Sequence, residues 1–193
     1  EKIERKFAFF NRDITLIKST SGHLPPLGPD DWKFQNNVKN MLEKMVDNGF
    51  HIVITTNQPG ISKGTTTREV QEKICKNIIN SFDSGYREKF RYYIGEESEK
   101  SKPHKEILEN ILKNEKIDIL NSIVVGNTRT DEKFAKNINL PFTPAHKFFR
   151  QEQSVTFMMG FPSCGKTAHC KEFHPFDLRV CIDDIIRSMN EEY

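Results

Sequence analysis

The sequence lacks the features that mark several specialised classes of protein. Its 193 residues contain one tryptophan and four cysteines, and the cysteines form no C-x-x-C pair. No apolar stretch of signal-peptide length stands at its amino end, and the mean hydropathy of −0.63 argues against a membrane protein. We therefore expect an intracellular protein of a reducing compartment, nuclear if the organism is a eukaryote.

The chain also lacks an excess of charge of either sign. Lysine and arginine number 29 against 27 aspartates and glutamates, which leaves a net charge of +2. Nucleic-acid binding needs a concentrated basic surface, so this balance alone indicates no such partner. With 36% hydrophobic residues and 15 phenylalanines, the chain is long enough for one or two globular domains with a substantial core.

Short apolar runs alternate with segments of helical period. Buried strands are predicted at 7–10, 50–55, 90–94 and 122–125, and amphipathic helices at 38–46, 70–78, 107–112 and 132–138. Strands that alternate with helices are typical of an α/β fold with a mainly parallel sheet. A passage with proline and phenylalanine, from Leu140 to Arg150, ends this pattern, and a new strand begins at Val155. We therefore predict two domains, 1–150 and 151–193.

The second segment carries a phosphate-binding loop. The residues Gly160, Phe161, Pro162, Ser163, Cys164, Gly165, Lys166 and Thr167 fit G-x-x-x-x-G-K-[ST] between a predicted strand and a predicted helix. Glycines let successive backbone N–H groups surround phosphate oxygens. Lys166 is expected to reach the β and γ phosphates and Thr167 to hold Mg²⁺, so this segment predicts ATP binding.

Two further features of this segment have alternative interpretations. Asp183 and Asp184 follow a predicted strand at 179–182, where a carboxylate accepts a proton from an attacking hydroxyl or organises a metal. Either residue equally fits the N-cap of a following helix. Cysteines and histidines gather between Cys164 and Cys181, but their spacing is not that of a zinc finger, so zinc is disfavoured.

In the first segment, polar residues follow the predicted strands where each strand ends. The carboxyl ends of parallel strands meet at one edge of a sheet, so we expect these groups to line a crevice. They are Asn11 and Asp13 after the first strand, Thr56 and Asn57 after the second, Lys102 further into the loop after the third, and Asn127 after the fourth.

Four stretches of the chain resemble the motifs of haloacid dehalogenase (HAD) type phosphatases. They are residues 10–17 (FNRDITLI), 55–61 (TTNQPGI), 102–103 (KP) and 124–127 (VVGN). With the neighbourhood of Ser21, Gly22 and Trp32, the run Leu140-Pro141-Phe142 and the phosphate loop, they resemble polynucleotide kinase/phosphatase, a bifunctional family that repairs nucleic-acid ends. The resemblance implies a HAD-like, Rossmann-type sheet followed by a P-loop α/β kinase domain. It also implies removal of 3′-phosphates by the first domain and ATP-dependent phosphorylation of 5′-hydroxyls by the second.

The first motif departs from the family pattern D-x-D-G-T, in which the leading aspartate attacks phosphorus. Asn11 stands at that position, and a neutral amide is a far poorer nucleophile and metal ligand than a carboxylate. Asn127 replaces a metal-binding aspartate in the same way, and the loop after it offers Asp131. We therefore expect a weakened Mg²⁺ site of Asn11, Asp13, Asn127 and Asp131. Ile14 replaces the glycine, so a positive φ at this position would be strained.

Three other residues match the family pattern. By the resemblance, Asp13, Thr56 and Lys102 serve as proton shuttle, phosphate hydrogen-bond partner and phosphate charge partner. Loss of two acids beside Lys102 makes the crevice more positive, so we expect it to bind a phosphate without hydrolysing it. In the second segment ten residues follow Asp183, and the resemblance places the remaining kinase strands beyond Tyr193, so we expect an incomplete kinase domain.

Alternative functions stay open at this point. The chain is either an enzyme that processes nucleic-acid ends, DNA rather than RNA, or an inactive module that binds phosphorylated ends and keeps a remnant phosphate loop. A small-molecule phosphatase of the histidinol-phosphate type shares T-N-Q-x-G-I but is disfavoured, because such relatives carry a Cys/His zinc loop and no kinase segment. Basic and aromatic residues expected on the crevice side are candidates for nucleic-acid contact, although strand packing and a solvated rim are their plainer roles. They are Lys63, Arg68, Lys89, Arg91, Arg129, Tyr92 and Tyr93.

Overall fold

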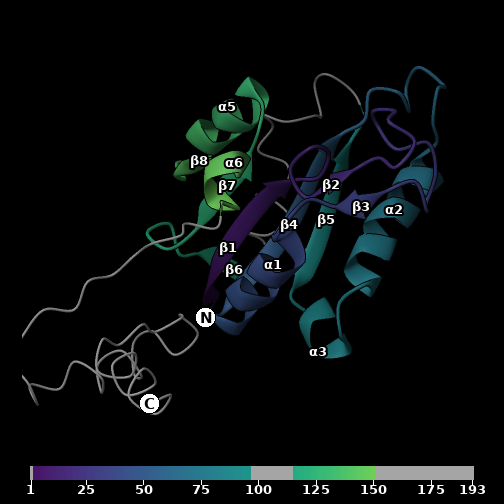
Figure 1. Cartoon of the computed structure of the whole chain (residues 1–193). Helices are drawn as coiled ribbons and strands as arrows, with labels where there is room; N and C mark the ends of the chain where they lie inside the picture. The colour runs from purple at the N-terminus through teal and green to yellow at the C-terminus, as the bar shows by residue number, and fades with distance from the viewer. Residues whose placement is uncertain (1, 97–114, 151–193) are drawn as a thin grey trace, which may run out of the picture. The chain divides into compact units, whose positions relative to one another are not determined.

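The computed structural model describes residues 2–96 and 115–150, and its centre is a parallel sheet (Figure 1). The strands run in the order β5-β4-β1-β7-β8, and β6 also pairs with β1; all of these pairings are parallel. The strands are β1 (Ile3–Asn11), β4 (Phe50–Asn57), β5 (Phe90–Gly95), β6 (Glu115–Ile117), β7 (Ile123–Gly126) and β8 (Phe142–Pro144). The prediction of an α/β fold with a mainly parallel sheet is confirmed.

Helices pack on both faces of this sheet. Alternate residues of β1 point to two separate clusters of buried side chains: Ala8 and Phe10 join one cluster, whereas Phe7 and Phe9 pack with Phe134. Because the side chains of a strand alternate between faces, four successive apolar residues are all buried. The helices are α1 (Val38–Asp47), α2 (Arg68–Asn80), α3 (Ser84–Arg87), α5 (Arg129–Asn137) and α6 (Ala145–Phe148). Between β1 and α1 in the chain, two short strands form an antiparallel pair, β2 (Ile17–Lys18) and β3 (Lys33–Phe34).

Local sequence explains where the longer helices begin and end. Helix α1 ends just before Gly49, whose φ of 84° is the left-handed conformation that favours glycine. The side chain of Thr67 caps α2 by accepting a hydrogen bond from the N–H of Val70. Thr128 and Asp131 form a capping box at the start of α5, so this helix begins at Arg129, three residues before the predicted start.

Several elements are not predicted by the sequence pattern. The passage from Leu140 to Arg150 contains β8 and α6, and β2, β3, β6 and α3 are similarly too short for a periodic signal. The predicted helix at 107–112 and the predicted second domain, 151–193, lie outside the described residues, so the division into two domains stays a prediction. Among the described helices, none is long and apolar enough to cross a membrane.

Candidate functional site

The sheet brings the ends of three neighbouring strands to one edge. Phe10 of β1 pairs with Ile54 of β4 on one side and with Val125 of β7 on the other. The residues that follow therefore emerge together, as expected for the carboxyl edge of a parallel sheet. Those that were predicted to meet there and that the structure describes are Asn11, Asp13, Thr56, Asn57 and Asn127.

Asp13, the expected proton shuttle, is held from three sides. Thr56 donates its hydroxyl to Asp13 Oδ2 at 3.2 Å, and Gln58 donates Nε2 to the same oxygen at 2.8 Å. Arg12 donates Nε to Asp13 Oδ1 at 2.9 Å and its Nη2 to Oδ2 at 3.1 Å. The carboxylate is thus neutralised by an ion pair and fixed in place by two polar side chains.

Arg12 is 0% exposed and connects Asp13 to α2. Its Nη2 donates to Gln71 Oε1 at 2.7 Å, and its Nη1 lies 3.7 Å from Cys75 Sγ. Burial lowers the pKa of the guanidinium, but the charge of Asp13 and its hydrogen bonds outweigh that effect, so the net shift of the pKa is upward. Burial also raises the pKa of the Cys75 thiol.

Sequence analysis assigned no role to Arg12 or Gln58. Arg12 stands between Asn11 and Asp13 at the end of a buried strand, and a buried charge needs a partner of opposite sign. Its place in the sequence therefore signals the ion pair with the neighbouring aspartate. The contact of Gln58 with Asp13 depends on how the turn after β4 folds, which no local pattern specifies.

The two asparagines that replace acids are hydrogen-bond donors. Asn11 Nδ2 donates to the backbone carbonyl of Asp13 at 3.0 Å. Asn127 Nδ2 donates to the carbonyl of Ile14 at 2.8 Å and to Thr15 Oγ1 at 3.2 Å. An ionised carboxylate accepts hydrogen bonds only, so it cannot make these contacts with carbonyl oxygens. The loop after β1 is therefore built around an amide at both positions.

Ile14 adopts a left-handed backbone conformation with φ of 63°, so the strain expected at this position is present. Its N–H donates to the carbonyl of Ile17 at 2.9 Å, and its own carbonyl accepts from Gln35 Nε2 at 3.0 Å as well as from Asn127. These contacts hold a β-branched residue in a conformation that such residues avoid.

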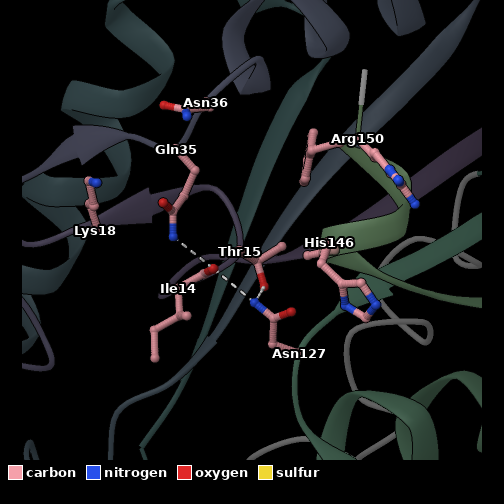
Figure 2. A pocket seen from close by; sticks show the side chains of 10 residues that line it. Ile14, Thr15, Lys18, Gln35, Asn36, Asn127, His146 and Arg150 are labelled. Carbon is pink, nitrogen blue, oxygen red and sulfur yellow. Dashed lines mark hydrogen bonds between the residues drawn. The ribbon is translucent and has the colours of Figure 1, made fainter. Parts of the chain in front are cut away.

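A pocket of about 320 Å³ opens beside this loop (Figure 2). Ile14, Thr15 and Asn127 line it on one side, and residues between Ala145 and Arg150 form another wall. Within the described part of the chain, no aspartate or glutamate lines the pocket. Its polar lining consists of Thr15, Lys18, Gln35, Asn36, Asn127, His146 and Arg150.

Asp131 lies in the first turn of α5 and not in a loop. Its Oδ2 accepts hydrogen bonds from the N–H groups of Asn127 at 3.1 Å and Thr128 at 3.0 Å, and the residue is 2% exposed. A Cβ atom added at Gly126 would lie 2.5 Å from Asp131 Cγ, so only glycine fits at the end of β7. The carboxylate of Asp131 is therefore a buried helix cap.

The two carboxylates of the predicted Mg²⁺ site make other contacts in the described part of the chain. Mg²⁺ requires nearly octahedral oxygen ligands and favours carboxylates, but Asp13 is already paired with Arg12. Asn11 and Asn127 direct amide N–H groups at backbone carbonyls, and Asp131 caps its helix. In the ranges that the structure describes, no three His, Cys, Asp or Glu residues are placed to hold a metal. The weakened Mg²⁺ site at these four positions stays a prediction.

Two of the basic residues expected on the crevice side lie at the opposite edge of the sheet. Lys89 precedes β5 and Arg91 is its second residue, and β5 runs parallel to β4. Arg91 donates to both carboxylate oxygens of Glu115, at 2.7 and 3.0 Å. The expected position is wrong, because residues that begin a parallel strand lie a strand length away from the edge where it ends.

The same edge contains His51, which is 7% exposed. Its Nε2 lies 2.8 Å from Arg5 Nη1, and Arg5 also pairs with Glu115 at 2.8 Å. Burial, followed by the positive charge of Arg5, lowers the pKa of His51 to about 4. A hydrogen bond from Arg91 lowers the pKa of Glu115. This edge is therefore an ion-pair network around a neutral histidine.

The other candidates for nucleic-acid contact have mixed outcomes. Tyr92 and Tyr93 are half-buried and pack against the two hydrophobic clusters, which confirms their plainer role. Arg68 begins α2 and pairs with two glutamates. Lys63 and Arg129 are exposed and follow β4 and β7, so they lie on the crevice side.

The segment between β2 and β3 is organised by Asp31. The carboxylate of Asp31 accepts hydrogen bonds from the hydroxyl of Ser21 at 2.6 Å, the N–H of Ser21 at 2.7 Å and the N–H of Leu27 at 2.8 Å. These contacts, with the Ser21 hydroxyl first, hold the pKa of Asp31 well below its usual range. Trp32 closes the segment by donating its indole N–H to the carbonyl of Pro29 at 2.8 Å.

The remaining predicted site residues lie outside the described residues. They are Lys102, Asp183 and the phosphate loop at 160–167, including Lys166 and Thr167. Their expected roles in phosphate binding, proton transfer and ATP binding stay predictions.

Comparison with known proteins identifies the family. Residues 6–149 match the polynucleotide kinase 3 phosphatase family. The chain belongs to this family. Among its relatives, a D-glycero-D-manno-heptose-1,7-bisphosphate 7-phosphatase of Thermoplasma volcanium is 34% identical over 145 residues, covering 71% of this chain and 96% of that protein. The bifunctional polynucleotide phosphatase/kinase of Schizosaccharomyces pombe is 24% identical over 216 residues, covering 86% of this chain and 50% of that protein.

Solved structures of phosphatases share the fold of this family member. A HAD-like phosphatase from Mesorhizobium loti superposes with a TM-score of 0.59 at 19% identity, over 72% of this chain and 70% of that one. The D,D-heptose 1,7-bisphosphate phosphatase of B. bronchiseptica, solved with magnesium and phosphate, superposes with a TM-score of 0.57 at 14% identity, over 86% of this chain and 99% of that one. The HAD-like fold expected from the sequence is therefore confirmed. The family match ends at residue 149, before the predicted phosphate loop.

Proposed function

We propose that this chain binds the terminal phosphate at a 3′ end of nucleic acid and does not hydrolyse it. The observation that carries the proposal is Asn11, which stands where the family pattern has its attacking aspartate. Its amide donates to the carbonyl of Asp13 at 3.0 Å. A neutral amide is a poor nucleophile, so a phosphate at this edge meets hydrogen-bond donors but no group that forms a phosphoenzyme.

The charges around the crevice support binding of an anion. Arg12 neutralises Asp13, and the amides at positions 11 and 127 carry no charge. The hydroxyl of Thr56 lies at the same edge, where it donates to Asp13 Oδ2 at 3.2 Å, and it is proposed to exchange that bond for one to a phosphate oxygen. Lys102 is proposed to add the positive charge that its match to the family pattern implies.

The choice of nucleic acid as the ligand rests on the family. We propose DNA ends rather than RNA ends, in strand-break repair. The segment 151–193 is proposed to contribute the start of an ATP-dependent 5′-hydroxyl kinase, in which Lys166 and Thr167 hold ATP and Mg²⁺ and Asp183 accepts the proton. Phosphate transfer from ATP to a 5′-hydroxyl oligonucleotide tests this part. The full-length protein should transfer the phosphate, and Lys166→Ala should not. Absence of transfer by the protein with its natural sequence refutes this part of the proposal.

Binding and turnover of one oligonucleotide pair test the phosphatase half. A 3′-phosphorylated strand should bind at least about tenfold more tightly than the same strand with a 3′-hydroxyl, as measured by fluorescence anisotropy. Adding Mg²⁺ should release no inorganic phosphate from the first strand. The double variant Asn11→Asp with Asn127→Asp restores the two acids of the family pattern. Its matched control is Asn40→Asp, at an exposed asparagine of α1. Magnesium-dependent release by the natural sequence that is lost in Asn11→Ala contradicts the proposal.

A sugar phosphate is the second candidate ligand. The observation that favours it is the coverage of the Thermoplasma volcanium protein, of which 96% aligns with this chain. That protein is named for a heptose 1,7-bisphosphate, and the same uncharged crevice suits the phosphate of a sugar. Direct competition decides between the two: displacement of the 3′-phosphorylated strand by heptose bisphosphate at a lower concentration than unlabelled strand requires favours the sugar.

A further inference from the structure

We infer that the pocket beside the crevice binds a second phosphate group of the same ligand. This inference rests on the proposed function, because it extends the site from a terminal phosphate to the next phosphate along the molecule. The pocket has a volume of about 320 Å³, and three basic side chains from two separate parts of the chain line it. They are Lys18 of β2, His146 of α6 and Arg150, which follows α6.

Within the described part of the chain, these basic groups have no partner of opposite charge. In the two ranges that the structure describes, the side chains of Lys18, His146 and Arg150 make no ion pair and no hydrogen bond. Arg12, by contrast, is matched by Asp13. Lys18 and Arg150 at one hollow, with no described acid in its lining, create a positive potential that an anion offsets.

The pocket also offers neutral donors and enough room for a phosphate with its sugar. Gln35 and Asn36 line it with amide groups, and pockets of this volume are in the range that holds small ligands. Figure 2 shows Lys18 and Gln35 on one side of the pocket, His146 and Arg150 on the other, and Ile14 and Asn127 between them. Basic side chains thus lie on two sides of an anion bound in the pocket.

Continuity with the crevice explains why both phosphates belong to one ligand. Asn127 lies at the carboxyl edge of the sheet and also lines the pocket, where its Nδ2 bonds to Thr15 Oγ1 at 3.2 Å. A ligand with its terminal phosphate beside Asn11 therefore passes Asn127 as it extends toward α6. The shared chemistry is a second phosphate one sugar away, which is either the phosphodiester of a nucleic-acid strand or the far phosphate of a sugar bisphosphate.

The test compares ligands with one and two phosphates. The probes are thymidine 3′-monophosphate and the dinucleotide TpTp, together with fructose 6-phosphate and fructose 1,6-bisphosphate, measured by calorimetry on the full chain. Lys18→Gln with Arg150→Gln should weaken binding of a two-phosphate ligand at least about tenfold and leave its one-phosphate counterpart unchanged. It should also lower the salt slope for TpTp by about 0.7. Lys147→Gln, at an exposed lysine of α6 outside the pocket, is the control and should change the binding of neither ligand.

Each outcome has one meaning. A selective loss for TpTp that a neutral methylphosphonate linkage reproduces supports a phosphodiester as the second phosphate, and a selective loss for the bisphosphate alone supports a sugar. Equal affinity of one-phosphate and two-phosphate ligands, or equal weakening of both by the double variant, overturns the inference that the pocket binds a second phosphate. In that case, binding of thymidine 3′-monophosphate still preserves the proposed function. No binding of any of the four ligands overturns both.

Discussion

Replacing Arg12 by methionine removes a buried positive charge while keeping most of the side-chain volume. Arg12 has no exposed side-chain surface, and the side chain of its partner Asp13 is 15% exposed. Removing one partner of such a buried pair costs about 3–5 kcal/mol, because the other charge is left without compensation. Gln71 also loses the donor to its Oε1 at 2.7 Å. We therefore expect Arg12→Met to lower the free energy of unfolding by about 3–5 kcal/mol.

Urea unfolding at pH 7, followed by circular dichroism, measures this change, and a double-mutant cycle assigns it. Arg12→Met with Asp13→Asn removes both charges, so the two single changes should be non-additive by about 1–3 kcal/mol. Arg91→Met is the matched control: Arg91 also pairs with a carboxylate, but its side chain is 42% exposed, so its loss should cost about 1 kcal/mol or less. A loss below 1 kcal/mol for Arg12→Met, or strict additivity in the cycle, refutes the reasoning about the ion pair.

Three further predictions concern other parts of the site and the opposite edge. The pKa of His51 falls from 6.5 to about 4 on folding, so between these pH values the unfolded chain binds more protons than the folded chain. The contribution of neutral His51 to the free energy of unfolding is therefore fully present above pH 6.5 and is lost as the pH falls toward 4. This loss reaches up to about 3 kcal/mol. His51→Gln should remove this dependence of stability on pH, and the control His23→Gln, at an exposed histidine, should keep it. A pH dependence that survives His51→Gln contradicts its assignment to His51. Asn127→Asp exchanges two donated hydrogen bonds for a carboxylate facing a carbonyl, so thermal unfolding should show about 1–3 kcal/mol of destabilisation, and an unchanged midpoint would mean that the loop does not depend on the amide. Asp31→Ala should speed hydrogen exchange at the amides of Ser21 and Leu27, and protection that persists at both amides would rule out Asp31 as their anchor.

Much of the scaffold follows from apolar periodicity. The run from Phe7 to Phe10 is buried on both faces of a parallel sheet, so it has to be continuous, and it predicts a central strand. Helix α1 follows from its apolar spacing and from Gly49. The meeting of Asn11, Thr56 and Asn127 then follows, because parallel strands share one carboxyl edge.

The parts of the site that sequence did not predict depend on contacts between distant segments. The partner of Gln71 on α2 is Arg12, which is 59 residues away in the chain, and no local pattern contains that contact. By contrast, the misplaced Lys89 and Arg91 were within reach of sequence reasoning, since both begin a strand whose end faces the crevice. Asp131 likewise has a local signal, because Thr128 three residues before it predicts a capping box.

The close approach of Gly126 to Asp131 has a consequence for the electric field at the site. With 2.5 Å between the place of a missing Cβ and a buried carboxyl carbon, the junction of β7 and α5 has no room for a side chain at position 126. The carboxylate of Asp131 lies against the partly positive end of the α5 dipole and offsets it. Attraction of an anion to this edge then depends on the side chains of the crevice, so an exchange of those side chains changes the affinity together with the reaction.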